Sequence, residues 1–316
     1  MDVKRFEFLC HIADYGSFSK AASVIGVTQP SLGRQIRKLE DECGMRLLYR
    51  NGRGASLTPE GAQLLLRIRP LLKEIDSAIS DLQAVRNSAR GAVSIGMTPA
   101  VSRIIGYRLL LAAREKYPKI NLNIVTGYSG YLLEWLASGR IDVGILDNER
   151  RADHLVFDHI AQLSLSLVSA SAQARLAVQA GEAIDISALK NLPLVLPSRM
   201  HGLRRTMDIA AADAGISLNV TYEIDAHDLV REIVLAGAAH TVMCASAMQS
   251  EIERGELVAT LLTPKVSTRL LCGTPSNRPV SAASRLIISL IKATLAETAG
   301  QRTGDISIDY GGNLSA

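Results

Sequence analysis

The fold of the N-terminal part of this chain is decided by one stretch, residues 16–61, which reads GSFSKAASVIGVTQPSLGRQIRKLEDECGMRLLYRNGRGASLTPEG. Ser17 and Thr28 are typical helix N-cap residues, and each precedes a run whose apolar residues recur at helical spacing. Gly26 supplies a tight turn between the two runs. An earlier helix is predicted from the apolar positions Phe6, Leu9, Cys10 and Ala13. The pattern therefore predicts short helices in a helix-turn-helix arrangement.

The helix that follows Thr28 has two different faces. Its apolar face, expected to point to the core, consists of Leu32, Ile36 and Leu39. Its polar face consists of Gln29, Ser31, Arg34, Gln35 and Lys38. Arginine pairs with guanine, glutamine with adenine, and serine suits phosphate, so this face is typical of a recognition helix in a major groove. The alternative is a solvated polar face on an ordinary three-helix bundle.

A hairpin is predicted directly after this helix. Residues 47–50 and 55–57 read as strands on either side of Asn51–Gly54. Arg50 and Arg53 lie at or near its tip, where they can enter the adjoining minor groove or contact backbone phosphate. The hairpin makes the solvated-face alternative less attractive. We therefore expect seven DNA-binding residues: Gln29, Ser31, Arg34, Gln35, Lys38, Arg50 and Arg53.

A long helix is predicted over residues 59–88, opened by Thr58, Pro59 and Glu60. Its apolar residues alternate at steps of three and four, which is a heptad seam: Leu65, Ile68, Leu72, Ile75, Ile79 and Leu82. A lone helix cannot bury such a seam, so a second copy of the chain is the simplest partner and a homodimer is expected. The alternative is packing on the chain's own C-terminal domain.

Charge and composition agree with this division. Residues 1–90 hold 14 Lys and Arg against 10 Asp and Glu, while the remaining residues hold 21 of each. An excess of positive charge confined to the N-terminal part suits a phosphate-binding domain. The four cysteines are too widely spaced for a zinc site or disulfide framework, so reduced core cysteines are expected, with a redox switch as the alternative: Cys10, Cys43, Cys244 and Cys272. No metal or cofactor is expected.

The chain has no run of 18 or more apolar residues and no signal-peptide pattern at its start. A cytoplasmic protein with no membrane partner is therefore expected.

Residues 1–60 resemble the DNA-binding domain of LysR-type transcriptional regulators, and the run 16–61 matches that family along its length. The sequence departs from the family's pattern with Gly33, Cys43 and Leu48, where Ser, Leu and Phe are usual, and Gly33 is expected on or near the DNA face. The resemblance implies an all-α winged helix-turn-helix domain with a long linker helix. It also implies double-stranded DNA as partner, a homodimer or homotetramer, and effects on DNA bending or on contact with RNA polymerase.

The rest of the chain alternates short apolar runs with helical stretches, which predicts an open, mostly parallel sheet covered on both sides. The predicted strands are 92–97, 121–126, 142–146, 194–197, 218–224, 240–244 and 269–273. The predicted helices are 109–115, 132–136, 202–214, 229–236 and 283–295. These elements form two α/β units joined by crossings near 161–169 and 264–269, with a cleft between the units. Residues 301–316 are expected to be a loose tail.

Ligands of open α/β sheets bind beyond the carboxyl ends of strands, at helix N-termini, a rule that selects Thr98, residues 127–129 and residues 197–202. The stretches LASGRIDVGIL (136–146) and PLVLPSRMHGLRR (193–205) are similar to the effector-binding domain of the same family, which resembles periplasmic solute-binding proteins. The resemblance implies a small, usually anionic effector with these contacts: Thr98, Ser129, Ser198, Arg199, His201 and Thr241. Thr98 and Ser198 could instead only cap helices, and Arg199 could pair on the surface.

These readings predict a DNA-binding domain over 1–58, a linker helix over 59–90, an effector-binding domain over 91–300 and a tail over 301–316. Subdomain I comprises 91–162 and 267–300, and subdomain II comprises 163–266. The predicted function is a sequence-specific transcription regulator controlled by a small molecule; the alternative is an architectural DNA-binding protein without a ligand. The sequence contains no G-x-S-x-G, P-loop or G-x-G-x-x-G motif, so no enzyme is expected.

Overall fold

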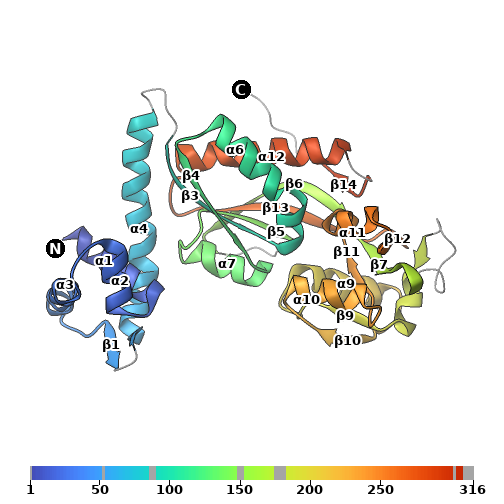
Figure 1. Ribbon diagram of the computed structural model, residues 1–316, viewed down its shortest axis with the longest axis horizontal. Helices are drawn as coiled ribbons and strands as arrows, with labels where there is room; N and C mark the ends of the chain where they lie inside the picture. Colours follow the sequence, from blue (N-terminus) through green and yellow to red (C-terminus); the bar gives the residue numbers. More distant parts are fainter. Residues whose placement is uncertain are drawn as a thin grey trace. The chain divides into compact units, whose positions relative to one another are not determined.

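The computed structural model describes residues 2–51, 54–84, 90–147, 153–173, 183–301 and 304–308 (Figure 1). The chain divides into two compact units. Unit 1 comprises Met1–Leu82 with Ser138–Arg140, and unit 2 comprises Gln83–Ala137 with Ile141–Ala316.

Unit 1 begins with three helices, α1 (Val3–Tyr15), α2 (Phe18–Ile25) and α3 (Gln29–Cys43). Each starts at a residue whose side chain accepts a backbone N–H of the first turn, and these caps are Asp2, Ser17 and Thr28. Each ends at a glycine in the left-handed conformation, which a residue without a Cβ adopts most readily: Gly16, Gly26 and Gly44. The predicted helix-turn-helix is confirmed.

The core of unit 1 is formed by all three helices and the start of the hairpin. Its fully buried members include Leu9, Ile12, Leu32, Ile36, Leu39 and Leu47. The predicted face of α1 was partly wrong, because Phe8 and Ile12 are buried whereas Cys10 and Ala13 are only half-buried. Gly33 is also buried rather than on a DNA face, so its difference from the family pattern concerns helix packing.

The predicted hairpin is present as β1 (Leu48–Asn51) and β2 (Gly54–Leu57), which pair antiparallel. Glu40 ties α3 to the hairpin: its Oε1 accepts hydrogen bonds from the Leu47 N–H at 3.0 Å and the Leu48 N–H at 3.3 Å. The Glu40 side chain is only 4% exposed, so these bonds lie in the interior. The hairpin is thereby held in a fixed position beside α3.

The long helix α4 runs over Pro59–Ala84. The first half of its predicted seam packs on the core of unit 1, through Leu65, Ile68 and Leu72 with the neighbouring Leu64. The sequence predicted that a second copy or the C-terminal domain would cover the seam. The first half of the seam is instead covered by the chain's own N-terminal helices. Exposed apolar side chains on α4 are Leu66, Leu71 and Ile75, and the side chains of Ile79 and Leu82 lie outside the described residues.

Unit 2 contains a six-stranded sheet in the order β14-β6-β13-β5-β3-β4. Its strands are β3 (Gly91–Met97), β4 (Ile120–Thr126), β5 (Val143–Asp147), β6 (Leu155–Ser164), β13 (Ser267–Pro275) and β14 (Ile306–Ser307). β3 pairs parallel with β4 and β5, as predicted, but β13 pairs antiparallel with β5 and β6. Figure 1 shows α6 (Tyr107–Lys116) and α12 (Ala282–Gln301) on one face and α7 (Ser129–Ala137) on the other.

A second group of strands has the order β11-β7-β12-β8, and a parallel pair, β9 and β10, joins it through one bridge between Leu194 and His240. The strands are β7 (Ser166–Ala170), β8 (Ile184–Asp185), β9 (Leu194–Leu196), β10 (Val220–Glu223), β11 (Thr241–Met243) and β12 (Leu257–Thr263). The helices are η2 (Ile186–Asn191), α9 (Gly202–Asp213), α10 (His227–Leu235), η3 (Ala245–Met248) and α11 (Gln249–Glu253).

Each of the two predicted crossings links two long strands. β6 continues through Leu165 into β7, and β12 leads through residues 264–266 into β13, so each crossing joins a strand of one sheet to a strand of the other. β7 pairs antiparallel with both β11 and β12, so the prediction of a mostly parallel sheet is wrong for this second group of strands. Within the described ranges, no helix is both long and apolar enough to cross a bilayer.

The expectation of a loose tail over 301–316 is wrong for residues 304–308. Ile306 pairs with Leu163 of β6, and Asp305 is buried. The Asp305 carboxylate accepts hydrogen bonds from the Ser246 N–H and hydroxyl, both at 2.7 Å, and from the Cys244 thiol at 2.9 Å. A polar segment is held here because its carboxylate meets donors from a distant part of the chain. Residues 302–303 and 309–316 lie outside the described residues.

Candidate functional site

The polar face predicted on α3 is exposed at its two cations. Arg34 and Lys38 are solvent-exposed, and within the described part of the chain neither makes a hydrogen bond or an ion pair. Gln29 is also exposed, whereas Ser31 and Gln35 are half-buried. This face brings donors and positive charge together within three turns of one helix.

The two glutamines are held by the helices that precede α3. The Ser19 hydroxyl donates to Gln29 Oε1 at 3.0 Å, and Arg5 Nε donates to Gln35 Oε1 at 3.2 Å. Arg5 also forms an ion pair with Glu42. No local pattern indicates the contact between Arg5 and Gln35, since these residues are 30 positions apart.

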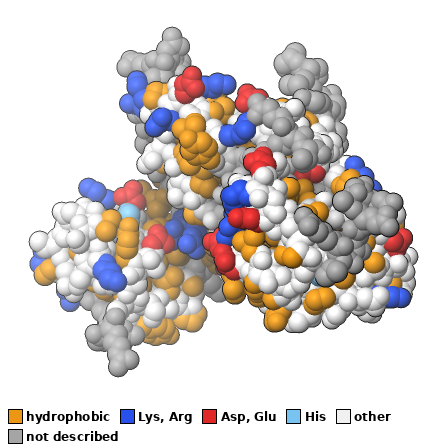
Figure 2. All heavy atoms as spheres, turned by 45° about the vertical axis from the view of Figure 1, so that its right-hand side comes forward, with side chains coloured by type: hydrophobic (Ala, Val, Ile, Leu, Met, Phe, Trp, Pro, Cys, Tyr) orange, Lys and Arg blue, Asp and Glu red, His pale blue; other side chains and the backbone are white. Residues whose placement is uncertain are grey.

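The wing arginines are described only in part. The backbone of Arg50 pairs with Ala55, but the Arg50 side chain and all of Arg53 lie outside the described residues. Figure 2 shows basic and acidic side chains interspersed on the face that it draws, so no single-sign field covers that side of the molecule.

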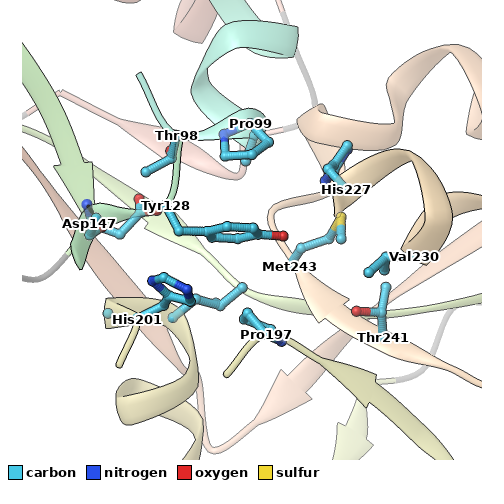
Figure 3. Close-up of a pocket in the computed structure, with 14 residues that line it drawn as sticks. Thr98, Pro99, Tyr128, Asp147, Pro197, His201, His227, Val230, Thr241 and Met243 are labelled. Atoms are coloured by element: carbon cyan, nitrogen blue, oxygen red, sulfur yellow. Dashed lines mark hydrogen bonds between the residues drawn. The ribbon is translucent and has the colours of Figure 1, made fainter. Parts of the chain in front are cut away.

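Unit 2 contains a cavity of about 500 Å³, its open mouth included (Figure 3). Four of the six predicted effector contacts line it, namely Thr98, Ser129, His201 and Thr241. Other lining residues include Tyr128, Asp147, Pro197, His227, Val230 and Met243. The rule that ligands lie beyond strand ends had selected the stretches that contain Tyr128 and Pro197, and it could also have found Asp147, the last residue of β5. His227 begins α10, and no sequence signal distinguished it from a surface histidine.

Thr98 lines the cavity, and its hydroxyl forms no hydrogen bond within the described residues. The residue is 1% exposed, and its Oγ1 has no hydrogen-bond partner in the described part of the chain. Thr98 is the N-cap residue of the helix that starts at Pro99, but its side chain makes no capping hydrogen bond, which argues against the capping alternative. Ser129 differs, because its hydroxyl accepts the backbone N–H of Asp147 at 3.2 Å. A buried hydroxyl without a partner is costly, which favours a ligand on Thr98.

His201 forms the floor of the cavity with Tyr128, whose ring stacks on the imidazole at a centroid distance of 4.6 Å. His201 is 1% exposed, and its Nε2 lies 3.2 Å from Asp225 Oδ2. Burial raises the pKa of Asp225, but hydrogen bonds from Ser198 and the His201 imidazole outweigh it and lower the pKa overall. Burial, together with Asp225 and Asp147, raises the pKa of Tyr128, so its hydroxyl stays protonated.

Two of the predicted effector contacts, Ser198 and Arg199, are not among the residues that line this cavity. The Ser198 N–H and hydroxyl both donate to Asp225 at 2.8 Å, so its side chain serves the turn. Arg199 is 78% exposed and lies 3.9 Å from Asp208, as in the surface-pair alternative. The turn that follows β9 directs His201 into the cavity and leaves Ser198 and Arg199 outside it.

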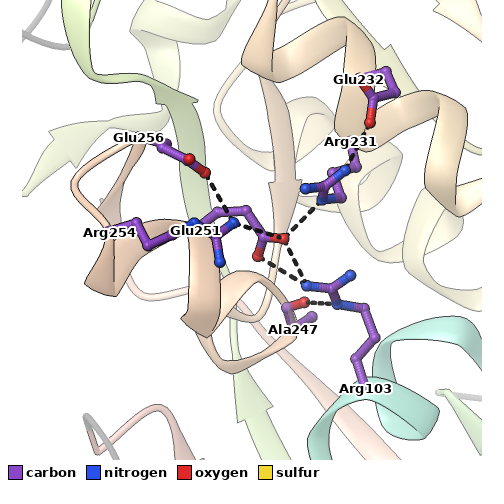
Figure 4. A network of polar contacts seen from close by, with 7 residues as sticks. All are labelled: Arg103, Arg231, Glu232, Ala247, Glu251, Arg254 and Glu256. Atoms are coloured by element: carbon purple, nitrogen blue, oxygen red, sulfur yellow. Dashed lines mark hydrogen bonds and ion pairs between the residues drawn. The ribbon is translucent and has the colours of Figure 1, made fainter.

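A buried ion network lies beside the cavity (Figure 4). Glu251 is 3% exposed; Arg103 contacts both of its oxygens, at 2.9 and 2.8 Å, and Arg231 donates at 2.7 Å. Burial raises the pKa of Glu251, but hydrogen bonds from Arg231 and Arg103 lower it overall to about 2. Arg103 lies in the π-helical turn η1 (Ser102–Gly106), and Arg231 lies on α10 one turn after His227. The network therefore links two helical segments that begin at the cavity.

His227 is the second histidine of the cavity. Its Nε2 is buried and has no hydrogen-bond partner in the described part of the chain. Burial and the nearby Arg103 lower its pKa, so the imidazole is neutral at neutral pH. The cavity therefore contains buried polar atoms to which a ligand can form hydrogen bonds: His227 Nε2, Thr98 Oγ1 and His201 Nδ1.

The cysteines do not form a reactive or metal-binding site in the described residues. All four are free, and burial raises the pKa of each thiol, most strongly for Cys244 and Cys272. No group of three or more potential metal ligands is found in the described part of the chain. A protonated thiol is a poor nucleophile, so these data favour a packing role over a redox switch.

Comparison with known proteins agrees with both halves of this description. Residues 3–62 match the bacterial regulatory helix-turn-helix protein, lysR family, and residues 86–296 match the LysR substrate binding domain. The chain is 27% identical over 282 residues to the HTH-type transcriptional regulator BbuR of Bordetella bronchiseptica, with 85% of this chain and 86% of that protein covered. It is 25% identical over 297 residues to the nitrogen assimilation regulatory protein nac of Klebsiella aerogenes, with 92% and 95% covered.

Solved structures show the same fold. A full-length OxyR variant from Pseudomonas aeruginosa matches with a TM-score of 0.73 at 18% identity, covering 93% of this chain and 94% of that chain. Full-length CbnR in complex with its target DNA matches with a TM-score of 0.67 at 20% identity, covering 95% and 100%. The chain therefore belongs to the LysR family of bacterial transcriptional regulators, with an N-terminal DNA-binding helix-turn-helix and a C-terminal effector-binding domain.

Proposed function

We propose that the chain reads its operator through the polar face of α3 and steadies the complex with its wing. The proposed contacts are Gln29, Ser31, Arg34, Gln35 and Lys38 from α3, with Arg50 and Arg53 from the hairpin. The observation that carries this proposal is the exposed, unpaired pair of cations, Arg34 and Lys38, on the helix that follows the turn. Exposed cations without acidic partners are available to phosphates and to the acceptors of guanine.

The effector occupies the cavity of unit 2 and contacts Thr98, Ser129, His201 and Thr241, with Tyr128 and His227 added to the predicted set. The buried Thr98 hydroxyl without a partner supports this assignment. A small anion fits, because the N-termini of α7, α9 and α10 carry partial positive charge and begin at cavity residues. Binding there shifts the equilibrium between conformations of the effector-binding domain.

Two copies of the chain pair through the exposed apolar side chains of α4, so that the protein acts as a homodimer or, where dimers pair, as a homotetramer. Regulation then acts through DNA bending or contact with RNA polymerase. The protein works in the cytoplasm, where its DNA is, and supplies no catalytic step of its own. The homologues are transcriptional regulators, which supports this last point.

The DNA-binding assignment is tested with Arg34→Ala in the full-length protein. We expect the dissociation constant for a selected operator to rise by about 10- to 100-fold, the loss of one bidentate base contact, with a much smaller change on random duplex. Arg114→Ala, which removes an exposed cation of α6, is the matched control and leaves both affinities unchanged. Equal losses on both duplexes would reduce Arg34 to a phosphate contact.

The effector assignment is tested by thermal shift against a panel of small organic acids. A ligand that binds the native state raises the melting temperature, and Thr98→Val removes the shift while conserving the shape of the side chain. A full panel that shifts neither protein would favour an architectural DNA-binding protein without a ligand.

A further inference from the structure

The cavity of unit 2 contains a histidine nitrogen, His227 Nε2, that is buried without a hydrogen-bond partner in the described part of the chain. We propose that the effector is a singly charged carboxylate with an apolar body, and that His227 takes up a proton from solvent as this carboxylate binds. This inference rests on the proposed function of the cavity as the effector site. It deepens that function because it names the class of ligand and makes its affinity depend on pH.

The walls of the cavity are mostly apolar. Six of the residues that line it have apolar side chains: Pro99, Ala100, Pro197, Leu203, Val230 and Met243. Val230 lies on α10 one turn after His227 and packs with Met243 in one hydrophobic cluster. Figure 3 shows both side chains on the side of the cavity where His227 lies. A ligand that contacts His227 therefore has apolar surface beside its charged end, which favours an apolar body.

The charges of the lining residues suit one carboxylate rather than two. No lysine or arginine is among the described residues that line the cavity, so the side chains there that can become cationic are His201 and His227. His201 already has a carboxylate partner, because its Nε2 lies 3.2 Å from Asp225 Oδ2. Asp147, an acid, lines the same cavity. A second carboxylate on the ligand would be buried beside Asp147 without a full positive charge to pair with, which is costly.

His227 Nε2 lies where an anion is favoured. His227 is the first residue of α10, and the first turn of a helix carries partial positive charge. Thr98 independently indicates a ligand in the same cavity, because it is 1% exposed and its Oγ1 has no partner among the described residues. A carboxylate supplies the acceptor that a proton on Nε2 needs. The resulting pair of imidazolium and carboxylate is neutral overall, so the ligand's charge is buried at a lower cost.

The groups around His227 keep its imidazole neutral in the free protein. Charged side chains near it come from η1, α10 and α11: Arg103, Asp228, Arg231 and Glu251. On the cavity side, the ionisable lining residues are Tyr128, Asp147 and His201. Glu251 is shared by Arg103 and Arg231, and burial together with Arg103 lowers the pKa of His227 below 6.5. A carboxylate within hydrogen-bond distance of Nε2 favours the imidazolium and raises this pKa.

Ligand binding and protonation of His227 therefore strengthen each other. The carboxylate binds most tightly below the pKa of His227 in the free protein, where the imidazole is already charged. Its dissociation constant rises through the interval between the pKa values of the free and the bound protein, and is constant above both. A neighbouring opposite charge shifts a pKa by about 1–3 units, so the whole change is about tenfold or more.

The experiment uses the full-length protein and two sets of ligands, each built on one body. One set is hexanoate, hexanamide, hexylamine and adipate; the other is cyclohexanecarboxylate with the corresponding amide, amine and 1,2-dicarboxylate. We expect the monocarboxylate to raise the melting temperature most within its set, because the amide and the amine lack its charge and the dicarboxylate adds a second. Thr98→Val should remove the shift, which assigns binding to the cavity.

The proton is measured by calorimetry with the monocarboxylate that gives the larger shift. Its dissociation constant should rise about fivefold or more between about pH 5.5 and about pH 8. Titrations in buffers of different ionisation enthalpy should show proton uptake on binding within this range. The carboxylates themselves stay ionised there, so the change belongs to the protein.

His227→Gln tests which group takes up the proton. Its amide still donates to the carboxylate but does not titrate, so the dissociation constant should vary by less than about twofold and meet the wild-type value near pH 8. His240→Gln is the matched control: burial also lowers the pKa of His240, but this residue is not among those that line the cavity, so the wild-type pH dependence should remain. Where a variant fails to fold, the His227 imidazole resonance of the wild-type protein decides, and it should titrate at a higher pH with the saturating monocarboxylate than without it.

Three results would overturn the inference. They are stronger binding by the amide, the amine or the dicarboxylate, a wild-type dissociation constant that does not change with pH, and a pH dependence that survives in His227→Gln. In each of them a ligand still binds and Thr98→Val still removes the shift, so the proposed effector site stands. Failure of the proposed function looks different: no organic acid would raise the melting temperature of the wild-type protein, and the effector site and this inference would both be wrong.

Discussion

The proposed recognition face of α3 and the proposed effector cavity of unit 2 are built in opposite ways. The five candidate residues on α3 lie within ten positions of one helix, and its cations face solvent. The cavity is lined by residues from Thr98 to Met243, and its polar atoms are buried. A surface made by one helix depends on local periodicity, whereas a cavity made by several strand ends depends on how distant segments pack.

Their polar groups differ as well. On α3, Gln29 and Gln35 each accept one hydrogen bond from a neighbouring helix, and the cations of Arg34 and Lys38 are exposed. In the cavity, Thr98 Oγ1 and His227 Nε2 are without partners in the described part of the chain. The first arrangement suits a fixed polyanion, and the second suits a small molecule that supplies the missing partners.

The largest effect should come from Glu251→Gln, because the cavity depends on a buried ion network and the recognition face does not. The substitution leaves Arg103 and Arg231 without the charge of the buried carboxylate that they share; because both arginines are partly exposed, the cost is about 3 kcal/mol, the low end for a broken buried ion pair. The free energy of unfolding of unit 2 is followed by the fluorescence of Trp135, the single tryptophan of the chain. Glu253→Gln, at an exposed position of α11, is the control and changes it by less than about 0.5 kcal/mol.

The same network has a defined pH dependence. The pKa of Glu251 is about 2 in the folded protein, against an ordinary value of 4.5. A lowered pKa means that the stabilisation is fully present above pH 4.5 and is lost as the pH falls toward 2. Glu251→Gln should remove this part of the acid dependence. An unchanged acid profile would contradict the assignment of the ion network.

The next effect should come from Glu40→Ala in unit 1. It leaves the backbone N–H groups of Leu47 and Leu48 buried without an acceptor, at a cost of about 2–3 kcal/mol. Hydrogen exchange at these two amides should accelerate, and affinity for the operator should fall because the wing loses its attachment to α3. Glu40→Gln is the matched control, since its Oε1 can accept both bonds. Equal exchange in the two variants would show that the wing does not depend on Glu40.

A smaller effect should come from Gly202→Ala, which tests how closely the segments around the cavity approach. A Cβ at this position would lie 2.0 Å from the Asp147 carbonyl oxygen, so α9 and the end of β5 must separate, at a cost of about 1–3 kcal/mol. Ligand-induced thermal shifts should weaken, while binding to random duplex is unchanged. Gly300→Ala, where a Cβ meets nothing within 4 Å, is the control. A Gly202→Ala protein with wild-type ligand response would contradict the close packing.

The smallest effect should be the pH response of His227. Its pKa is lowered from 6.5 by burial and by Arg103, so the unfolded chain takes up this proton more readily than the folded one. Stability is therefore fully present above pH 6.5 and falls as the pH drops below it. His227→Gln should flatten this slope in the Trp135 signal, and His240, whose pKa burial also lowers, accounts for a remainder. His11→Gln in unit 1 is the control. If His11→Gln flattened the pH dependence of stability as much as His227→Gln, the slope would not come from His227.

The cavity illustrates which side chains a sequence pattern can assign to one place in the fold. Thr98, Ser129, His201 and Thr241 were found because strand ends and helix starts are visible in the pattern, and each lines the cavity. Ser198 and Arg199 were included because they share a turn with His201, but turn geometry decides which side chains of residues 198–201 point inward. β6, β7 and β12 were missed because their pairing partners lie far along the chain, and antiparallel pairing across a crossing leaves no local signal.

By itself, the sequence determined the three N-terminal helices, their caps, the two-stranded wing and the alternation of strands and helices that follows. These features depend on side chains within a few residues of one another, so periodicity and capping chemistry are sufficient. Only the tertiary structure decided that Arg5 and Ser19 hold the recognition glutamines, that Asp305 secures the C-terminal segment, and that His227 enters the cavity. In each case a polar group contacts a residue or a cavity that a distant part of the chain forms. A local sequence pattern does not show which distant segments lie side by side.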